Sequence, residues 1–192
     1  MFQVIKQDIF KFFFLYIERG SIFAMFVFFL TLIAGSFLIR KHVKEYGDYF
    51  IVLIKSVEMA FLSLYVYIVI GITFLSREKH SDTYINLRPF STFDRTLVYP
   101  KYIYENILML IPLAILLYLL AAPFRKLSIS LLVGFFSSLA IEIMQLITRL
   151  GLFIVDDILT NILGMLIGYL ICRMAEWLYK SCYIILKGKE KT

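Results

Sequence analysis

Long apolar runs separated by short polar stretches dominate the chain. Five of these runs approach or exceed the roughly 20 residues that a helix needs to cross the hydrocarbon core of a bilayer. They lie at about Ser21–Ile39, Tyr49–Leu75, Ile103–Ala122, Leu127–Ile147 and Phe153–Tyr179. The pattern predicts an all-α fold, a polytopic membrane bundle of about five transmembrane helices.

The N-terminal segment Met1–Ile17 is too short to span and has a different pattern. Polar residues recur along one side and apolar residues along the other, as in helices that lie in the membrane interface. The polar positions are Gln3, Gln7, Lys11 and Glu18. We expect an N-terminal interfacial helix, with a short sixth span as the alternative. No small-residue cleavage signature marks the segment as a signal peptide.

Composition narrows the class of protein further. The chain is 61% hydrophobic with a mean hydropathy of +0.84, which is more apolar surface than a soluble domain of 192 residues can bury. The formal charge of +6 favours contact with anionic lipid surfaces. No basic stripe with interleaved aromatic residues lies on a soluble domain, so nucleic acid is not an expected partner. Without a linker or an internal repeat, residues 1–192 are expected to form a single membrane domain.

The cysteine and histidine residues indicate no metal or cofactor site. Cys172 and Cys182 stand ten residues apart without a CxxC motif, which is typical of small apolar side chains and not of a redox pair. His42 and His80 lie in loops without partners at ligand spacing. We therefore expect no cofactor, and no metal site at these residues.

A polar stripe interrupts the fourth span. Ser138, Glu142, Gln145 and Arg149 lie at i, i+4, i+7 and i+11, on one side of a helix. An ionisable residue inside a spanning helix is costly and is by default a functional-site hypothesis. At 1.5 Å per residue, Glu142 lies about 10 Å below Arg149. The stripe therefore belongs to the outer part of the bilayer and not to its centre.

Other polar residues are expected at the same end of the bundle. Asp157 and Asn161 share a stripe at the start of the last span, and Asn106 enters from that side on the third span. The loop Ser76–Tyr102 adds Asn86 and Arg88; because Pro89 follows Arg88, that residue should lie in an ordered bend. The expected ligand-binding set is Asn86, Arg88, Asn106, Glu142, Gln145, Arg149, Asp156, Asp157 and Asn161.

Arginines beside amides favour an anionic ligand, because guanidinium groups bind phosphate or carboxylate in a bidentate manner. A structural interpretation stands beside this one. Arg149 could close its turn by pairing with Asp156 or Asp157, and Glu142 could be satisfied by Asn161 or Asn106 between helices.

Three further features have structural interpretations. Gly164-x-x-x-Gly168 predicts close helix packing, because small residues let two helices approach. Lys55 and Glu58, at i and i+3 inside the second span, are expected to pair with each other. Pro112 falls in the middle of the third span and should kink it.

The distribution of basic residues gives a weak orientation. Nine Lys and Arg lie on the side that holds the N-terminus and the Ser76–Tyr102 loop, against ten on the other side. If Arg88 and Arg149 serve a ligand, the count becomes seven against ten. The positive-inside rule then places the polar site on the extracellular face of the cell membrane.

In order and spacing, these residues resemble the VanZ-like family of bacterial membrane proteins. The resemblance covers residues 86–169 as a core. Its landmarks are Asn86-Leu87-Arg88-Pro89-Phe90, Asn106, Ile111-Pro112-Leu113, Ile141-Glu142-x-x-Gln145, Arg149, Asp156-Asp157-x-x-x-Asn161 and Gly164-x-x-x-Gly168-Tyr169. Residues 1–75 then hold an amphipathic segment and two accessory transmembrane helices. The resemblance implies a cell-envelope role associated with low-level resistance to teicoplanin-type glycopeptides, and no enzymatic activity is established for the family.

Three functions follow from these observations. The protein could bind a membrane lipid or a lipid-linked cell-wall precursor through an anionic head group. It could be an intramembrane enzyme with Glu142 as base and Asp157 orienting a partner, although the sequence shows no Ser–His or Cys–His nucleophile pair. It could be a non-catalytic scaffold in which the polar groups serve helix packing alone. The sequence leaves open the ligand, the oligomeric state, and whether a metal ion lies among Glu142, Asp156 and Asp157.

Overall fold

The structure is a computed structural model that describes residues 2–40, 46–77, 79, 84–92 and 100–189. Five α-helices account for most of the described residues, and each is long and apolar enough to cross a membrane. They are α1 (Phe2–Arg40), α2 (Tyr46–Ile70), α3 (Pro100–Leu120), α4 (Leu127–Thr148) and α5 (Val155–Lys189). The prediction of an all-α membrane bundle with five spans is confirmed.

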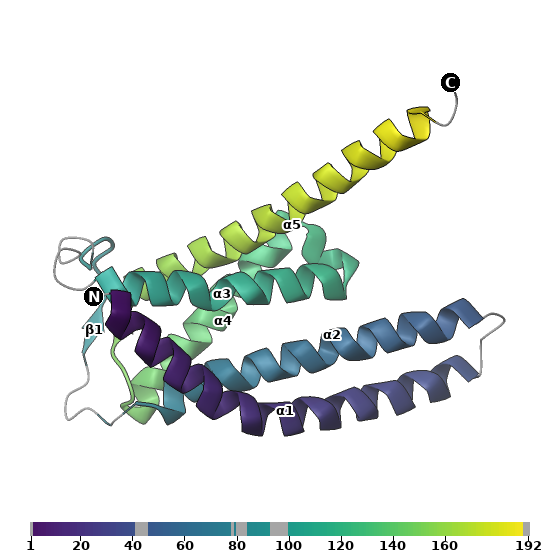
Figure 1. Cartoon of the computed structure of the whole chain (residues 1–192). Coiled ribbons are helices and arrows are strands. Elements are labelled where there is room, and N and C mark those ends of the chain that lie inside the picture. The colour runs from purple at the N-terminus through teal and green to yellow at the C-terminus, as the bar shows by residue number, and fades with distance from the viewer. Residues whose placement is uncertain (1, 41–45, 78, 80–83, 93–99, 190–192) are drawn as a thin grey trace.

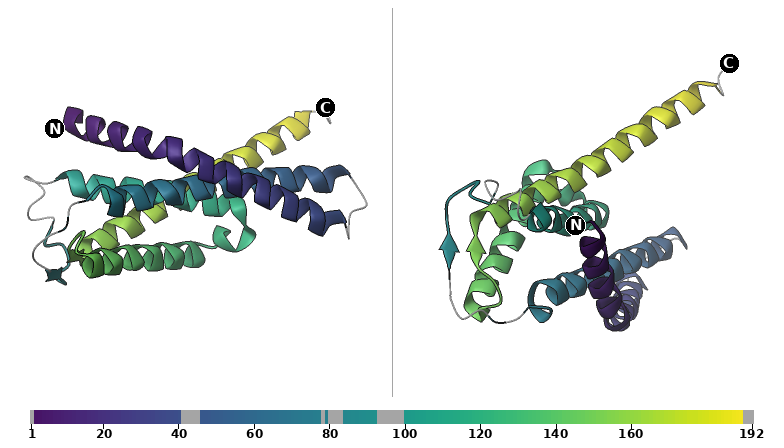
Figure 2. Two further views of the ribbon diagram at one scale, coloured as in Figure 1. Left: turned by 90° about the horizontal axis from the view of Figure 1, so that it is seen from below. Right: turned by 60° about the vertical axis from the view of Figure 1, so that its left-hand side comes forward.

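The five helices form two groups (Figure 1). α1 and α2 run side by side as a hairpin, whereas α3 packs along α5 and α4 packs on α5 from another side. Contacts between α2 and α3 join the two groups. In the left view of Figure 2, α1 crosses α2 at an angle, and the right view shows the hairpin to one side of the other helices. Most of the side chains that could form a site therefore come from the group of α3, α4 and α5.

The connections divide the molecule into two ends (Figure 1). We call the end with the α2–α3 loop and the α4–α5 connection the loop end. A short π-helix, η1 (Gly71–Leu75), and two very short strands, β1 (Ile85–Asn86) and β2 (Phe153–Ile154), lie there. We call the opposite end the turn end; it holds the 3-10 helix η3 (Ala122–Arg125), which links α3 to α4.

The expected interfacial segment and the first span belong to one continuous helix. α1 is one helix from Phe2 to Arg40, and the part suited to spanning begins at Tyr16. The helix changes direction partway along its length (Figure 1). Gly20 lies where the amphipathic pattern changes to the apolar one, and one glycine costs a helix only about 1 kcal/mol. A change from amphipathic to apolar pattern alone does not end a helix.

α5 is longer than the expected Phe153–Tyr179 span. It continues to Lys189, and 35 residues give a helix of about 52 Å, well beyond the roughly 30 Å of a hydrocarbon core. Figure 1 shows its C-terminal part projecting past the bundle at the turn end. The predicted span ends at Tyr179, where the apolar run ends, but the helix continues through the more polar residues that follow.

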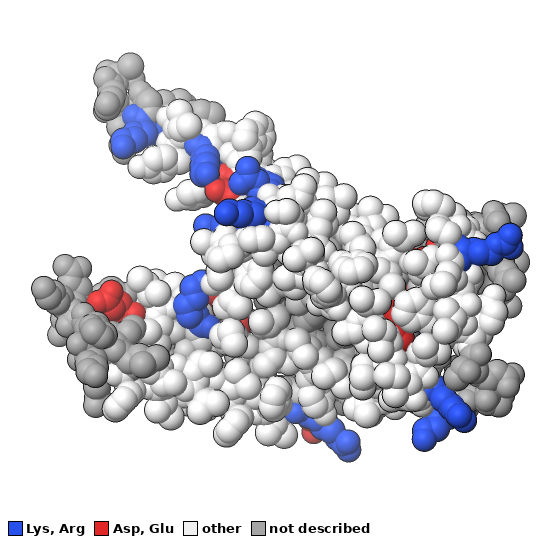
Figure 3. All heavy atoms as spheres, turned by 180° about the vertical axis from the view of Figure 1, so that it is seen from behind, with Lys and Arg blue, Asp and Glu red and all other residues white. Residues whose placement is uncertain are grey.

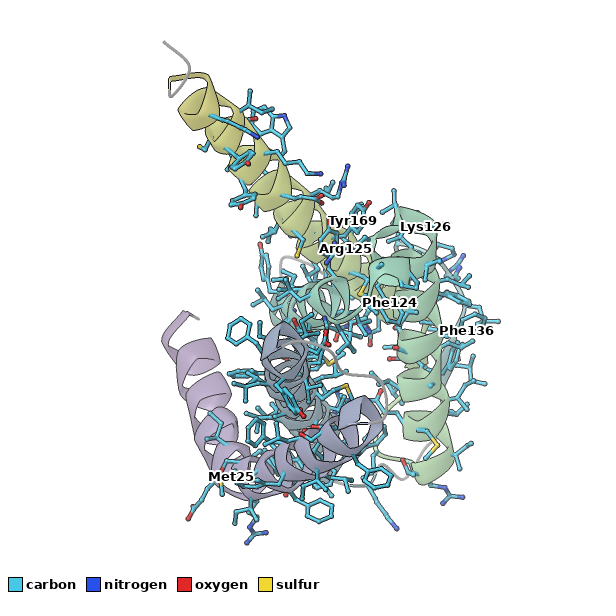
Figure 4. The ribbon with its side chains drawn as sticks, turned by 90° about the vertical axis from the view of Figure 1, so that its right-hand side faces the viewer. Met25, Phe124, Arg125, Lys126, Phe136 and Tyr169 are labelled. Carbon is cyan, nitrogen blue, oxygen red and sulfur yellow. The ribbon has the colours of Figure 1, made fainter. Side chains whose placement is uncertain are left out.

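Apolar side chains both fill the bundle and cover it. The buried cluster consists of Leu110, Leu113, Ala114 and Leu117 from α3 and Met165 from α5. Large apolar side chains such as Met25 of α1 and Phe136 of α4 are exposed and point away from the bundle (Figure 4). An apolar exterior around a small core is what a bundle surrounded by lipid requires.

Side chains also close the turn end. The Tyr169 hydroxyl of α5 donates to the Arg125 carbonyl of η3 at 3.1 Å, and Figure 4 shows the two residues side by side. Lys55 and Glu58 form the predicted ion pair, with 2.7 Å between nitrogen and oxygen. The Lys55 ammonium also donates to the carbonyls of Leu119 and Leu120 at the end of α3. This lysine therefore ties the hairpin to α3.

Candidate functional site

The pairing of β1 with β2 brings the α2–α3 loop onto the start of α5. The strands are parallel, with Ile85 opposite Phe153 and Asn86 opposite Ile154. The Phe153 amide also donates to the Tyr84 carbonyl at 3.1 Å. Residues that lie about 70 positions apart in the sequence thus form one layer over the polar ends of α4 and α5.

Asp156 holds this loop in place. Its carboxylate accepts hydrogen bonds from the backbone amides of Phe90 at 2.6 Å and Thr92 at 2.7 Å, and lies 3.4 Å from the Ser91 hydroxyl. Asp156 is almost completely buried, and Phe90 has a left-handed backbone with φ of 64°. Because both of its oxygens are engaged by the loop, Asp156 acts as a loop anchor.

Asn86 organises the same loop from within. Its side-chain amide donates to the Ser91 hydroxyl at 2.8 Å, and its side-chain oxygen accepts from the Arg88 backbone amide at 3.1 Å. The second bond is an Asx turn, in which asparagine replaces a backbone carbonyl. Arg88 therefore lies in an ordered bend, as Pro89 predicts, and its side chain is exposed.

Glu142 and Gln145 of α4 are both buried beneath this layer. A Glu142 oxygen accepts from the Ile154 backbone amide at 3.0 Å, which joins α4 to β2. The Gln145 amide donates to the Thr73 carbonyl at 3.3 Å, which joins α4 to η1. A π-helix shifts the hydrogen-bond register of the backbone and is found more often than average at functional sites.

Arg77, Asn106 and Asp157 lie close to this pair. The Arg77 guanidinium acts electrostatically on the carboxylates of both Glu142 and Asp157, and the Asn106 side chain interacts with Asp157. A Cβ atom at Gly151 would lie 3.1 Å from Arg77 Nη1 and 3.0 Å from Gln145 Oε1. Arg77 after η1, Glu142 of α4 and Asp157 of α5 therefore lie near one another, beside the α4–α5 connection.

Asn161 lies one turn deeper and faces α4. Its side-chain amide donates to the Ser138 hydroxyl at 2.8 Å, and only 1% of its surface is exposed. Within the described part of the chain its side-chain oxygen has no hydrogen-bond partner. Asn161 and Ser138 thus close the polar cluster on the side of the membrane interior.

The two arginines of the predicted set do not share this buried environment. Arg88 and Arg149 are both exposed, and Arg149 ends α4 with a left-handed backbone, φ 58°. Among the described residues, neither guanidinium has a hydrogen bond or an ion pair to Asp156 or Asp157. The alternative in which Arg149 closes its turn by an ion pair with these aspartates is therefore wrong; the turn closes through the amides of Arg149 and Leu150, which donate to the carbonyls of Leu146 and Gln145.

Charged side chains gather at the two ends of the molecule, with a mostly uncharged surface between them (Figure 3). At the loop end, the predicted site residues form two layers. Asp156 and Asn86 hold the loop, while Glu142, Gln145, Asp157, Asn106 and Asn161 lie below it. The side chains of Arg88 and Arg149 are exposed and belong to neither layer.

Sequence reasoning missed Arg77 and Thr73. It counted Arg77 only as a loop charge, although the residue stands two positions beyond the last apolar residue of the second run. A basic residue at that boundary, on the side of the membrane where the carboxylates lie, is the signal that would have found it. Thr73 contributes through its backbone carbonyl, and no residue-type pattern predicts such a contact.

The acidic and the basic groups at the loop end differ in their contacts. Among the described residues, no group of three or more His, Cys, Asp or Glu side chains is placed to hold a metal. Asp156 and Glu142 accept from backbone amides, whereas the exposed charges at this end that come from the predicted set are guanidinium groups.

A multi-pass helical bundle with a polar cluster under one loop defines a class of membrane protein, and the sequence places the chain within it. The profile of the VanZ/LLP1 family matches residues 59–178, so the chain belongs to this family. The matched segment runs from the second half of α2 to the exposed part of α5 and contains the whole polar cluster. No curated protein and no solved structure matches the chain.

Proposed function

We propose that the protein binds the anionic head group of a membrane lipid or lipid-linked cell-wall precursor at the loop end, and thereby lowers access of teicoplanin-type glycopeptides. The observation that carries the proposal is a difference between the acidic and the basic side chains. The carboxylates are hydrogen-bonded within the protein, whereas the two arginine side chains are exposed. Asp156 and Glu142 accept from backbone amides, whereas Arg88 and Arg149 are exposed at the same end of the bundle. Because β1 and β2 are parallel, Arg88 after β1 and Arg149 before β2 lie beyond opposite ends of the strand pair.

The physical basis is preorganisation. A guanidinium group binds phosphate through two parallel hydrogen bonds, and the gain is larger when its backbone is already fixed. The Arg88 backbone amide closes an Asx turn and Arg149 caps α4, so binding orders little more than the two side chains. Head-group binding at this level leaves the hydrocarbon tails in the membrane.

The test measures lipids that co-purify with the protein and growth in the presence of teicoplanin. Arg149→Ala and Arg88→Ala should each lower retained anionic lipid by about tenfold, the equivalent of one lost charge-assisted contact. They should also lower teicoplanin resistance. Arg19→Ala is the matched control, because Arg19 is an exposed arginine on α1, outside the matched family segment.

Unchanged lipid retention in both loop-end variants, or an equal loss in Arg19→Ala, contradicts the proposal. A loss of lipid retention without a change in resistance separates its two parts. The lipid site then stands, and the link to glycopeptides fails.

A second candidate is an intramembrane enzyme that modifies such a lipid or a wall peptide. The observation that favours it is the convergence of two carboxylates, Glu142 and Asp157, with Arg77. A buried carboxylate beside a guanidinium provides a general base and a group to stabilise negative charge. Turnover of a labelled precursor by the purified protein, abolished in Glu142→Gln with binding retained, is the expected result for an enzyme. Absence of turnover by the wild-type protein rejects it.

A further inference from the structure

An apolar cavity of about 210 Å³ lies between α2, α3 and α4. We call it the chain slot. Its lining is Tyr65, Val66, Val69, Ile70, Phe74, Leu110, Leu113, Ser137 and Ile141. We propose that the chain slot holds one hydrocarbon chain of the lipid whose head group binds at the loop end. The inference rests on the proposed function and adds that its ligand is anchored by a lipid chain and is not a soluble anion.

The lining of the chain slot suits hydrocarbon and not water. Seven of the nine residues are aliphatic or are phenylalanine. The Tyr65 hydroxyl is already engaged, since it donates to the Met109 carbonyl. An apolar cavity stays dry because water there has too few hydrogen-bond partners, and such cavities accept apolar molecules instead.

The chain slot runs along the bundle. Its α2 and η1 residues, from Tyr65 to Phe74, recur on one side of the helix over about 13 Å. On α4 it extends over one turn, from Ser137 to Ile141. A lipid chain lies roughly parallel to the helices that surround it, so the long axis of the cavity matches its occupant.

One side of the chain slot opens to the bilayer and the other is closed. Val66 and Ile70 at the open side are 43% and 45% exposed, whereas Leu110 at the floor is 1% exposed. A chain can therefore enter sideways from the membrane and contact buried side chains. A helix from another protein is about 10 Å across with its side chains and does not fit a cavity of this volume.

The part of the chain slot nearest the loop end adjoins the polar cluster. Phe74 follows Thr73, whose carbonyl accepts from Gln145, and Ile141 precedes Glu142. Arg77 lies three residues beyond Phe74. A larger apolar cavity of about 280 Å³ lies between α1 and α2, but its lining includes no residue of α3, α4 or α5. Continuity with the polar cluster thus selects the chain slot.

The experiment uses two phospholipids that carry a photoactivatable diazirine in one acyl chain, phosphatidylglycerol and phosphatidylcholine. The full-length protein is reconstituted with each, irradiated and digested, and the labelled peptides are identified by mass spectrometry. In the wild-type protein, we expect label from phosphatidylglycerol to concentrate on the slot segments of α2 and α3 around Val66, Ile70 and Leu110. Because the bilayer is itself apolar, the preference comes from packing and head-group contacts, and is modest.

Ser137→Phe fills the chain slot, and the expected result is a fall of about twofold in label on these segments. Ala140→Phe is the matched control, because it adds the same ring to an exposed position of α4 that does not line the cavity. Should Ser137→Phe fail to fold, Val66→Phe narrows the slot from its exposed side and should give the same loss. Label spread evenly over the lipid-facing helices, or unaffected by Ser137→Phe and Val66→Phe, overturns the inference, as does an equal loss in Ala140→Phe.

The two lipids separate this inference from the function on which it rests. Equal slot labelling by phosphatidylglycerol and phosphatidylcholine, lost in Ser137→Phe, supports the chain slot and contradicts selection of an anionic head group. Head-group selection by Arg149 with no preference for the slot segments leaves the proposed function standing and rejects the chain slot.

Discussion

Asp156 shows how one residue can carry a chemical signature and still have a structural role. An intramembrane carboxylate near arginines suggested a ligand contact, but Asp156 is buried and accepts from the amides of Phe90 and Thr92. A buried charge is tolerated only when hydrogen bonds replace its lost hydration. The loop amides supply those bonds, and in return the carboxylate fixes the loop.

Asp156→Asn should release this loop. Asparagine offers one acceptor oxygen and turns an NH₂ group toward a backbone N–H, so at least one strong bond is lost, at a cost of about 2 kcal/mol. Protease cleavage or hydrogen exchange between Tyr84 and Thr92 should accelerate by roughly 30-fold. Asp157→Asn is the control, because among the described residues Asp157 accepts no backbone amide of this loop. Equal loop exchange in wild type and Asp156→Asn contradicts the anchoring role.

At the scale of elements, the contact between α3 and α5 depends on two glycines. A Cβ atom at Gly164 would lie 2.1 Å from the Ile107 carbonyl oxygen, and one at Gly168 would lie 2.5 Å from that of Ile111. Both obstacles are helix backbone, which cannot move without separating the helices. Close approach of these helices is what brings Asn106 of α3 to Asp157 of α5.

Gly164→Ala should therefore separate α3 from α5 and lower the stability of the bundle by about 2–3 kcal/mol. Gly134→Ala is an informative control, since its Cβ would meet only the flexible side chain of Met165, at 2.8 Å from Cγ. Thermal unfolding in detergent measures both. A smaller loss of melting temperature for Gly164→Ala than for Gly134→Ala would show that the helices adapt to the added methyl group.

The other joint between elements is Lys55, which donates to Glu58 and to two carbonyls at the end of α3. Lys55→Met removes all three contacts, whereas Glu58→Gln removes only the charge of one partner. We expect Lys55→Met to lower the melting temperature more than Glu58→Gln, because the last carbonyls of a helix have no partners within it. Equal losses of melting temperature in the two variants would show that Lys55 stabilises the protein only through its ion pair with Glu58.

For the whole molecule, the charge count predicts an extracellular loop end. In a background with Cys172→Ser and Cys182→Ser, Lys79→Cys should react with a membrane-impermeant maleimide in intact cells. In a second protein, with Cys172→Ser as its only substitution, the native Cys182 is exposed on α5 and should react only after the cells are opened. The opposite labelling pattern places the loop end in the cytoplasm, where it cannot contact cell-wall precursors on the extracellular side of the membrane.

The sequence predicted the spans because apolar length alone determines them, and it predicted which end gathers polar residues because that end follows from counting along the helices. It could not divide those residues by role. Asp156 and Arg149 have equally conspicuous side chains, yet the first anchors a loop and the second is exposed, and the difference depends on backbone amides from a distant segment. Hydropathy likewise carried no signal for the β1–β2 pairing, whose strands have two residues each.

The anchoring of Phe90 by Asp156 has a consequence for biogenesis. The ribosome makes the loop first, and the carboxylate that satisfies its amides follows 66 residues later, at the start of the last span. Until α5 inserts, those amides must remain in contact with water or with other partners, so the loop cannot settle on the membrane surface as it does in the finished protein. The anchored form of the loop therefore requires the final helix, and a chain that ends before Asp156 lacks the acceptor for the Phe90 and Thr92 amides.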